Sequence, residues 1–252
     1  MMIIQQPECD NCLHLNGNGN KTLIRQLTDL NIIVCSDWLK SEVQQSFLKD
    51  KPIHMIYNWV DTKKFKENHD ESIFKKYGLD KKKKILLSVS AGWGNFNTRY
   101  QDACRLANIL PQEYQLVLVG SKDKDITIQN NITYIPFVAG TEELSKLYSA
   151  ALAFVGFSVQ DTFGKVFAEA MLCGTPAIVF NATACPEVVG DTGYAVPPYD
   201  VNAMLEKIKE IDENGREYYS QRCKDRVLSN YDYKQNVMKY INIYESIINS
   251  KQ

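Results

Sequence analysis

Two carboxylates flank a Phe-Gly step in the segment QDTFGKVFAEAMLCGTPAIV, residues 160–179. Asp161 lies in a loop, and Glu169 follows on what the apolar spacing predicts to be a buried helix. This helix should begin near Gly164, where unpaired first-turn amides and the helix dipole favour an anion. The turn Phe163, Gly164, Lys165 and Val166 is therefore a candidate phosphate site, and Gly164 lets a ligand approach the backbone closely.

A purely structural interpretation of the same residues stays open. Asp161 would then favour the helix N-terminus by its charge, and Lys165 with Glu169 would form a surface ion pair worth a few tenths of a kcal/mol. Val166, Ala170 and Cys173 have the spacing of a buried stripe, which puts Glu169 at the border of core and cleft. The carboxylate pair alone does not decide between the two interpretations.

Short apolar runs alternate with segments of helical periodicity along most of the chain. From Ile85 onward the strands ILLSVS, QLVLVG, ITYI, LAFVG and AIVF are separated by predicted helices, and further helices fill 200–249. This alternation predicts an α/β fold with a doubly wound parallel sheet, which binds ligands at the carboxyl ends of its strands. Two more strands, NIIVC and IHMIY at 31–35 and 53–57, precede a polar stretch that ends at Lys84.

The composition excludes several classes of partner and site. The 252 residues include 29 basic and 30 acidic side chains, so we expect no nucleic-acid partner. No apolar run is long enough to span a membrane and the first residues lack a signal-peptide pattern, which predicts a cytoplasmic location. The seven cysteines are scattered, as reduced core cysteines are. Only Cys9 and Cys12 form a CxxC, with His14 nearby, and without a second ligand pair we expect no metal site.

The block DTFGKVFAEAMLCGTPAIV, followed by NATACPEVVGDTGYAVPP, resembles the donor-binding half of family 4 retaining glycosyltransferases of the GT-B architecture. In that family an acidic residue, seven intervening residues and a Glu span the Phe-Gly turn. The segment IHMIYNWVDTKKF resembles the interdomain strand and linker of the family, with Trp59 in place of a Gly. The resemblance runs from about Asn31 to the C-terminus and implies a Rossmann-like C-terminal domain.

The resemblance also implies roles for single residues. Glu169 would hold the ribose hydroxyls of a nucleotide diphosphate sugar, such as a UDP- or GDP-hexose, because its two oxygens can accept from a vicinal diol. Asp161 would contact the sugar ring as the catalytic residue, and the amides of the turn 163–166 would contact the diphosphate. Glu187 matches an acidic position near the donor. No cofactor or metal ion is implied, since amides and cations would offset the diphosphate charge.

Three departures from the family pattern qualify these roles. Asp161 stands where Glu is usual and is one methylene shorter, so a water could bridge its sugar contact. The usual Arg-Lys pair after the first strand of this domain is reduced to Arg99, and Lys165 could supply the missing cation. Only 84 residues precede the strand at Ile85, so we expect most of the N-terminal acceptor domain to be absent.

These departures lead to a predicted division of the chain. We expect a remnant of the N-terminal domain at 1–58, a linker at 59–84, a nucleotide-sugar-binding domain at 85–230 and a returning helix at 231–252. The stripe Val237, Ile241 and Tyr244 on that helix would lack its partner, which predicts self-association. Peripheral membrane contact would belong to the missing N-terminal half.

Two functions are compatible with the sequence. The first is hexose transfer to an unidentified acceptor, for which this chain supplies the donor-binding portion. The alternative is a noncatalytic or decayed module that binds nucleotide sugar or serves as an interaction domain. A nicotinamide oxidoreductase is disfavoured because no GxGxxG follows a predicted strand.

Overall fold

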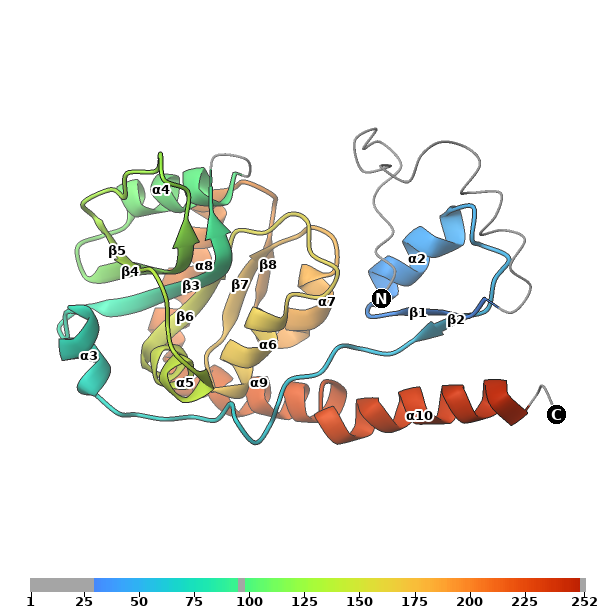
Figure 1. Cartoon of the computed structure of the whole chain (residues 1–252). Coiled ribbons are helices and arrows are strands. Elements are labelled where there is room, and N and C mark those ends of the chain that lie inside the picture. Colours follow the sequence, from blue (N-terminus) through green and yellow to red (C-terminus); the bar gives the residue numbers. More distant parts are fainter. Residues whose placement is uncertain (1–29, 95–97, 250–252) are drawn as a thin grey trace.

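The computed structural model describes residues 30–94 and 98–249. Most of these residues form a domain around a six-stranded sheet, and a small two-stranded unit lies beside it (Figure 1). The strands of the large sheet are β3 (Lys84–Trp93), β4 (Tyr114–Lys122), β5 (Ile132–Ile135), β6 (Ala151–Gly156), β7 (Ala177–Phe180) and β8 (Tyr194–Val196). All are paired in parallel, in the order β5-β4-β3-β6-β7-β8.

This strand order confirms the doubly wound α/β prediction. The chain builds outward from β3 to β5, returns to the centre of the sheet and builds outward again from β6 to β8. Leu86 and Leu87 of β3 pair with Ala153 and Phe154 of β6, and all four are buried. Strands covered on both faces by helices need continuous apolar runs, which is why these segments do not alternate in polarity. The crevice of such a sheet lies where the order reverses, between β3 and β6.

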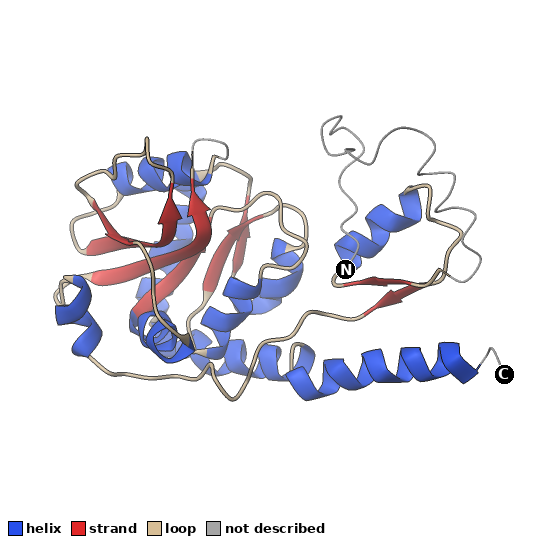
Figure 2. Ribbon diagram, viewed as in Figure 1, coloured by secondary structure: helices blue, strands red, loops and turns tan. Residues whose placement is uncertain are grey.

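Helices cover both faces of the sheet (Figure 2). One face carries α4 (Arg99–Ile109) and α8 (Val201–Asn214), which pack together. The other carries α5 (Thr141–Ala150), α6 (Lys165–Leu172) and α7 (Cys185–Val189), with α9 (Arg216–Asn230) packed on α6. A 3-10 turn, η2 (Gly190–Thr192), joins α7 to β8. The connection from β6 through α6 to β7 therefore brings the 160–179 segment to the central crevice.

The small unit consists of β1 (Ile32–Val34), α2 (Asp37–Gln45) and β2 (Ile53–Met55), with the two strands parallel. Ser36 is the N-cap of α2, as its sequence position suggests, and accepts from the Leu39 amide. A short helix, α3 (Ser72–Tyr77), forms within the predicted linker, and the polar composition of that stretch did not suggest it. The last helix, α10 (Tyr233–Asn249), runs beneath the small unit, and its Tyr240 contacts Trp59.

Burial on α6 differs from the expected stripe. Val166 is only half buried, whereas the buried positions of the helix are Phe167, Ala168, Ala170, Met171 and Leu172. Of the predicted stripe, Ala170 and Cys173 are fully buried, and only Val166 differs from the prediction. Burial extends beyond the stripe because β6 and β7 lie on one side of α6 and α5, α7 and α9 on others. The helix is therefore enclosed on more than one face, and a helix enclosed in this way is apolar nearly all round.

Three other features of the chain bear on the predictions from composition. The five cysteines within the described residues are free thiols, and four of them are buried. Cys9, Cys12 and His14 lie outside the described residues, and within those ranges no cluster of three or more His, Cys, Asp or Glu is suited to hold a metal ion. None of the described helices has both the length and the apolar character needed to cross a bilayer.

Candidate functional site

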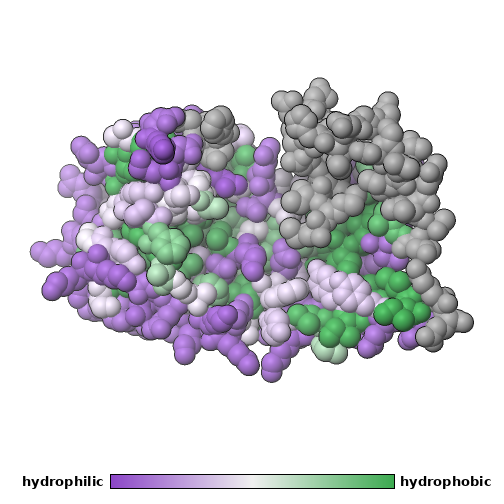
Figure 3. All heavy atoms as spheres, viewed as in Figure 1, coloured by the Kyte–Doolittle hydropathy of each residue, from purple (hydrophilic) through white to green (hydrophobic). Residues whose placement is uncertain are grey.

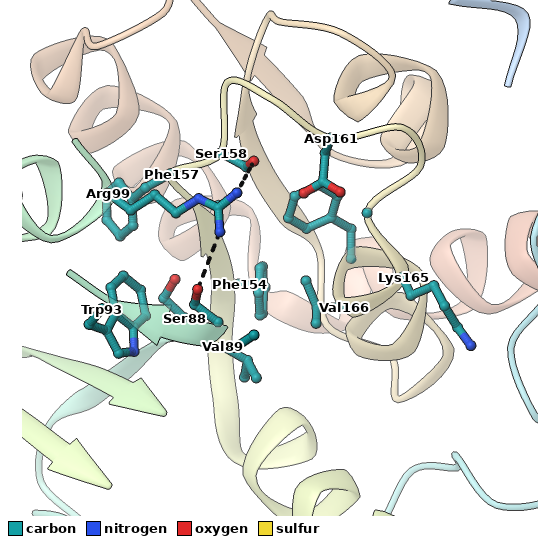
Figure 4. Close-up of a pocket in the computed structure, with 15 residues that line it drawn as sticks. Ser88, Val89, Trp93, Arg99, Phe154, Phe157, Ser158, Asp161, Lys165 and Val166 are labelled. Carbon is teal, nitrogen blue, oxygen red and sulfur yellow. Dashed lines mark hydrogen bonds between the residues drawn. The ribbon is translucent and has the colours of Figure 1, made fainter. Parts of the chain in front are cut away.

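A pocket of about 250 Å³ opens at the crevice between β3 and β6. Its walls come from 88–91 and Trp93 of β3, Arg99 of α4, Phe154 and 156–158 around the end of β6, Asp161 and the turn at 164–167 (Figure 4). Five of the sequence-predicted site residues, Arg99, Asp161, Gly164, Lys165 and Val166, therefore line one cavity although they come from different elements. This is the place where a doubly wound sheet binds its ligand.

Arg99 and Asp161 are linked across the pocket by a serine. The Arg99 guanidinium donates to the Ser158 hydroxyl (Nη2 to Oγ, 2.9 Å) and, more weakly, to the Ser90 hydroxyl (Nη1 to Oγ, 3.4 Å). Burial raises the pKa of Asp161, while the Ser158 hydroxyl, the Arg99 charge and the Gly164 backbone oppose that rise. Figure 4 shows the carboxylate directed into the cavity that the guanidinium also faces. The pocket thus offers a cation for phosphate oxygens and a carboxylate for hydroxyl groups.

The start of α6 forms the wall beside Asp161. Gly164 caps the helix with a φ of 83°, and a Cβ at this position would lie 2.4 Å from the Phe167 ring. Phe163 is buried and packs edge-on against Tyr231 (ring centroids 5.1 Å apart), which anchors the turn. The helix N-terminus therefore reaches the pocket in a conformation that only glycine adopts without strain.

Lys165 follows the cap and is exposed. Its ammonium group points away from Asp161 (Figure 4), so the structure does not bring this cation to the centre of the pocket. Within the described residues, no ion pair joins Lys165 to Glu169. The structural interpretation of these two residues as a surface ion pair is therefore not supported. Arg99 is thus the cation that the pocket holds closest to Asp161.

Glu169 lies one turn further along α6 and is half buried, just outside the residues that line the pocket. The Tyr148 hydroxyl of α5 donates to its carboxylate (Oη to Oε2, 3.2 Å). Burial raises the pKa of Glu169 to about 7, with the Tyr148 hydrogen bond and the Lys165 charge acting in the opposite direction. A carboxyl group with this pKa changes its charge within the physiological pH range, and such shifted pKa values are common at functional sites.

Residues 69–226, more than half of the chain, match the protein family described as glycosyl transferases group 1. The chain belongs to this family. A curated relative, N-acetyl-alpha-D-glucosaminyl L-malate synthase of Bacillus anthracis, is 25% identical over 231 residues, which are 86% of this chain and 60% of the relative. The chain therefore spans less than two thirds of the length of this relative.

Solved structures of larger proteins share the fold. Sucrose-phosphate synthase from Thermosynechococcus elongatus aligns with a TM-score of 0.77 at 22% identity, covering 94% of this chain and 64% of that one. HepE from Anabaena, solved in complex with UDP and glucose, aligns with a TM-score of 0.73 at 17% identity, covering 92% and 68%. These likenesses agree with the parallel six-stranded sheet and confirm the GT-B-type α/β fold of this family member.

Glu187 takes a position in this group 1 glycosyltransferase chain that its sequence did not suggest. It lies outside the residues that line the pocket, and its two oxygens accept from the amides of Asp37 (2.7 Å) and Trp38 (3.1 Å) at the start of α2. Close by, the Cys35 thiol donates to the Thr162 carbonyl in the loop that carries Asp161 (3.3 Å). Glu187 thus joins the small unit to the domain that holds the pocket.

Sequence reasoning missed two side chains that contact candidate site residues, Ser158 at Arg99 and Tyr148 at Glu169. Ser158 follows directly after the end of β6, where polar residues of doubly wound sheets meet a ligand, and this position was a usable signal. Tyr148 gave no such signal, because an aromatic residue at a buried helix position is ordinary core. Its hydrogen bond to Glu169 depends on the packing of α5 against α6.

Proposed function

We propose that this chain is the donor-binding part of a retaining glycosyltransferase that transfers a hexose from a UDP- or GDP-sugar to an acceptor. The observation that carries the proposal is the convergence of Arg99, Asp161 and the α6 N-terminus on one pocket at the reversal point of the sheet. The complex of HepE with UDP and glucose supports a nucleotide-sugar ligand for a related fold.

Transfer breaks the bond between the anomeric carbon of the donor sugar and the diphosphate oxygen, while the oxygen of an acceptor hydroxyl bonds to that carbon and its proton passes to the departing diphosphate. Negative charge then builds up on the departing nucleoside diphosphate. Arg99 and the amides at the start of α6 are placed to stabilise this charge, and such preorganised donors are a major source of catalysis. The proposed roles need no metal ion, since the guanidinium and the helix N-terminus supply the compensating charge.

Asp161 and Glu169 would bind the two ends of the donor. Asp161 faces the cavity and would accept from hydroxyls of the sugar ring, and Glu169 would accept from the ribose diol. We leave Glu187 out of the donor contacts because it lies outside the residues that line the pocket and its carboxylate binds the first amides of α2. A cytoplasmic location stays a prediction.

Calorimetric titration of the wild type, Arg99→Ala and Glu169→Ala with UDP and with GDP tests this proposal. Loss of one charge-assisted contact should weaken binding by on the order of 1.5 to 3 kcal/mol. Lys209→Ala, on α8, is a matched control that removes a charge away from the pocket and should bind like the wild type. Equal affinities for all four proteins would refute the assigned roles, and no binding by the wild type would refute the proposal.

The alternative, a noncatalytic nucleotide-sugar-binding module, is favoured by one observation. The pocket is lined by residues of the large domain alone, with none from the small unit. Release of nucleoside diphosphate from a UDP-hexose, measured with a panel of acceptors, separates the alternatives. Binding without release under all conditions would favour the module.

A further inference from the structure

Tyr148 presents a buried hydroxyl to Glu169 from the neighbouring helix. The side chain is 0% exposed, and its Oη lies 3.2 Å from Glu169 Oε2. Burial and the nearby carboxylate raise the pKa of Tyr148 well above its ordinary value, so the phenol keeps its proton at physiological pH. Tyr148 is therefore a permanent hydrogen-bond donor to this carboxyl group.

Packing fixes the direction of that donor. The Tyr148 ring contacts the rings of Phe65 and Phe154, with centroids 6.2 Å and 6.0 Å away. The backbone is held as well, because the Thr175 hydroxyl donates to the Tyr148 carbonyl (2.5 Å). With ring and backbone both held, the phenol oxygen has little freedom to leave Glu169.

Few charged groups share the environment of Glu169. Tyr148 faces it from α5 and Lys165 acts on it from α6, while the Glu169 charge contributes to the raised pKa of the Cys173 thiol at the end of α6. From α9, Arg216 reaches the Cys173 carbonyl but not Glu169 (2.8 Å to the carbonyl). Within the described residues, β6, β7 and α7 add no titratable group to this set. The Tyr148 hydrogen bond is accordingly the main specific interaction that favours the ionised carboxylate over its protonated form.

We propose that Tyr148 is a positioning residue for nucleotide recognition, whose hydroxyl holds Oε2 of Glu169 so that the carboxylate can accept from a ribose diol. The inference rests on the proposed function, which places Glu169 on the ribose. Both hydroxyls of a diol donate best to an ionised carboxylate, because a protonated carboxyl group uses one oxygen as a donor itself. Oε2 can accept from Tyr148 and still accept from one hydroxyl, while Oε1 accepts from the other.

Nucleotide affinity should then depend on pH through Glu169. With a pKa of about 7, half of the carboxyl groups are ionised at neutral pH, and affinity rises as the pH rises through this value. Removing the phenol hydroxyl should raise that midpoint by about one pH unit, since a hydrogen bond to a charged group is worth roughly a factor of ten. At pH 7 the ionised fraction then falls about fivefold, whereas at about pH 9 it is nearly complete with or without the hydroxyl.

The experiment is calorimetric titration with UDP from about pH 6 to about pH 9 for the wild type, Tyr148→Phe and Tyr114→Phe. Tyr114 is the matched control, because it is a buried tyrosine whose hydroxyl donates to a carboxylate (Asp212 Oδ2, 2.7 Å). It lies at the N-terminal end of β4, whereas the pocket lies at the carboxyl ends of β3 and β6. We expect Tyr148→Phe to bind about fivefold more weakly at pH 7 and to recover near pH 9. Tyr114→Phe should follow the wild type throughout.

A purely structural role for Tyr148 predicts a different result. It would weaken binding by the same factor at every pH, or leave it unchanged, and either outcome overturns the inference while the proposed function stands. If the wild type binds neither UDP nor GDP, the proposed function fails together with the inference. Glu169→Gln provides a second check. This variant should bind UDP weakly and with an affinity that no longer depends on the ionisation of residue 169. Adding Tyr148→Phe to Glu169→Gln should not weaken binding further.

Discussion

The contact between Glu187 and α2 yields the sharpest stability prediction. The first amides of a helix lack intrahelical partners. In α2 the Asp37 and Trp38 amides are satisfied by Glu187, and the Leu39 amide by Ser36. Hydrogen bonds to a charged acceptor contribute about 1.5 to 3 kcal/mol when well desolvated, and the partly solvated setting here lowers the expected total for both bonds to about 1 to 2 kcal/mol.

Glu187→Ala should therefore lower the free energy of unfolding by about 1 to 2 kcal/mol, or the melting temperature by roughly 2 to 6 °C for a chain of this size. Asp37→Pro removes the donor of the shorter bond without breaking the helix, because proline is tolerated at the first helical position. Ser36 before it is already extended, with φ −161° and ψ 157°, as a residue before proline must be. Asp37→Ala keeps the amide and controls for loss of the Asp37 carboxylate.

Urea unfolding of the wild type, both single variants and the double variant completes a thermodynamic cycle. If the 2.7 Å bond between Glu187 and the Asp37 amide stabilises the fold, the two substitutions should couple by about 1 kcal/mol. Hydrogen exchange at the Trp38 amide should also speed up in Glu187→Ala. If the changes in unfolding free energy of the two single variants add to within about 0.3 kcal/mol in the double variant, the reasoning is refuted and the contact does not stabilise the fold.

Four other outcomes are expected. Asp161→Asn should weaken a UDP-hexose but not UDP in calorimetry, and an equal loss for both ligands would remove it from the sugar site. Gly164→Ala should lower stability by about 1 to 3 kcal/mol, because a Cβ would meet Phe167 at positive φ; an unchanged melting temperature would contradict this. Glu169→Gln should gain stability over the wild type as the pH rises from about 4.5 to about 7, since the raised pKa of Glu169 makes its ionisation destabilising; parallel melting curves against pH would disprove it. Ile241→Glu should reduce self-association in light scattering, and a wild type that stays monomeric on concentration would exclude that association.

The prediction of self-association rests on apolar residues that are exposed on α10. Ile241 and Tyr244 on α10 are 39% and 55% exposed, and Val237 of the same stripe is half buried. Figure 3 shows apolar atoms along this helix beneath the small unit. Scattered exposed apolar residues are normal, but several on one helix favour association.

The sequence predicted the large sheet well because its signals are local. Each strand is a short apolar run, and each helix has its own cap or breaker, such as Gly164 before α6 and Gly174 after it. The Phe-Gly step located the helix N-terminus, and strand-to-helix alternation then placed it at the crevice. Three short elements, α3, α7 and β8, were missed. The helices α3 and α7 have only six and five residues, too few to show a helical period.

Pairs of side chains far apart in the chain could not be predicted in this way. Glu187 looked like a donor contact, but its partners are amides about 150 positions earlier in the chain. Ser158 and Arg99 come together only once β3 and β6 are neighbours, and Tyr148 reaches Glu169 only once α5 packs against α6. Local patterns give the elements and the edge of the sheet that binds a ligand, whereas the polar contacts at that edge follow from tertiary packing.

Tertiary contacts also fix the backbone of the loop that carries Asp161. The Asp161 amide donates to the Thr183 hydroxyl (3.1 Å), its carbonyl accepts from the Ala184 amide (3.3 Å), and the neighbouring Thr162 carbonyl accepts from Cys35. A backbone tied at these points cannot advance toward a ligand by the length of one methylene without breaking hydrogen bonds. On the proposed function, a bridging water or the position of the sugar would make up for the shorter side chain of Asp161, and the contact of Cys35 with this loop would help to set that distance.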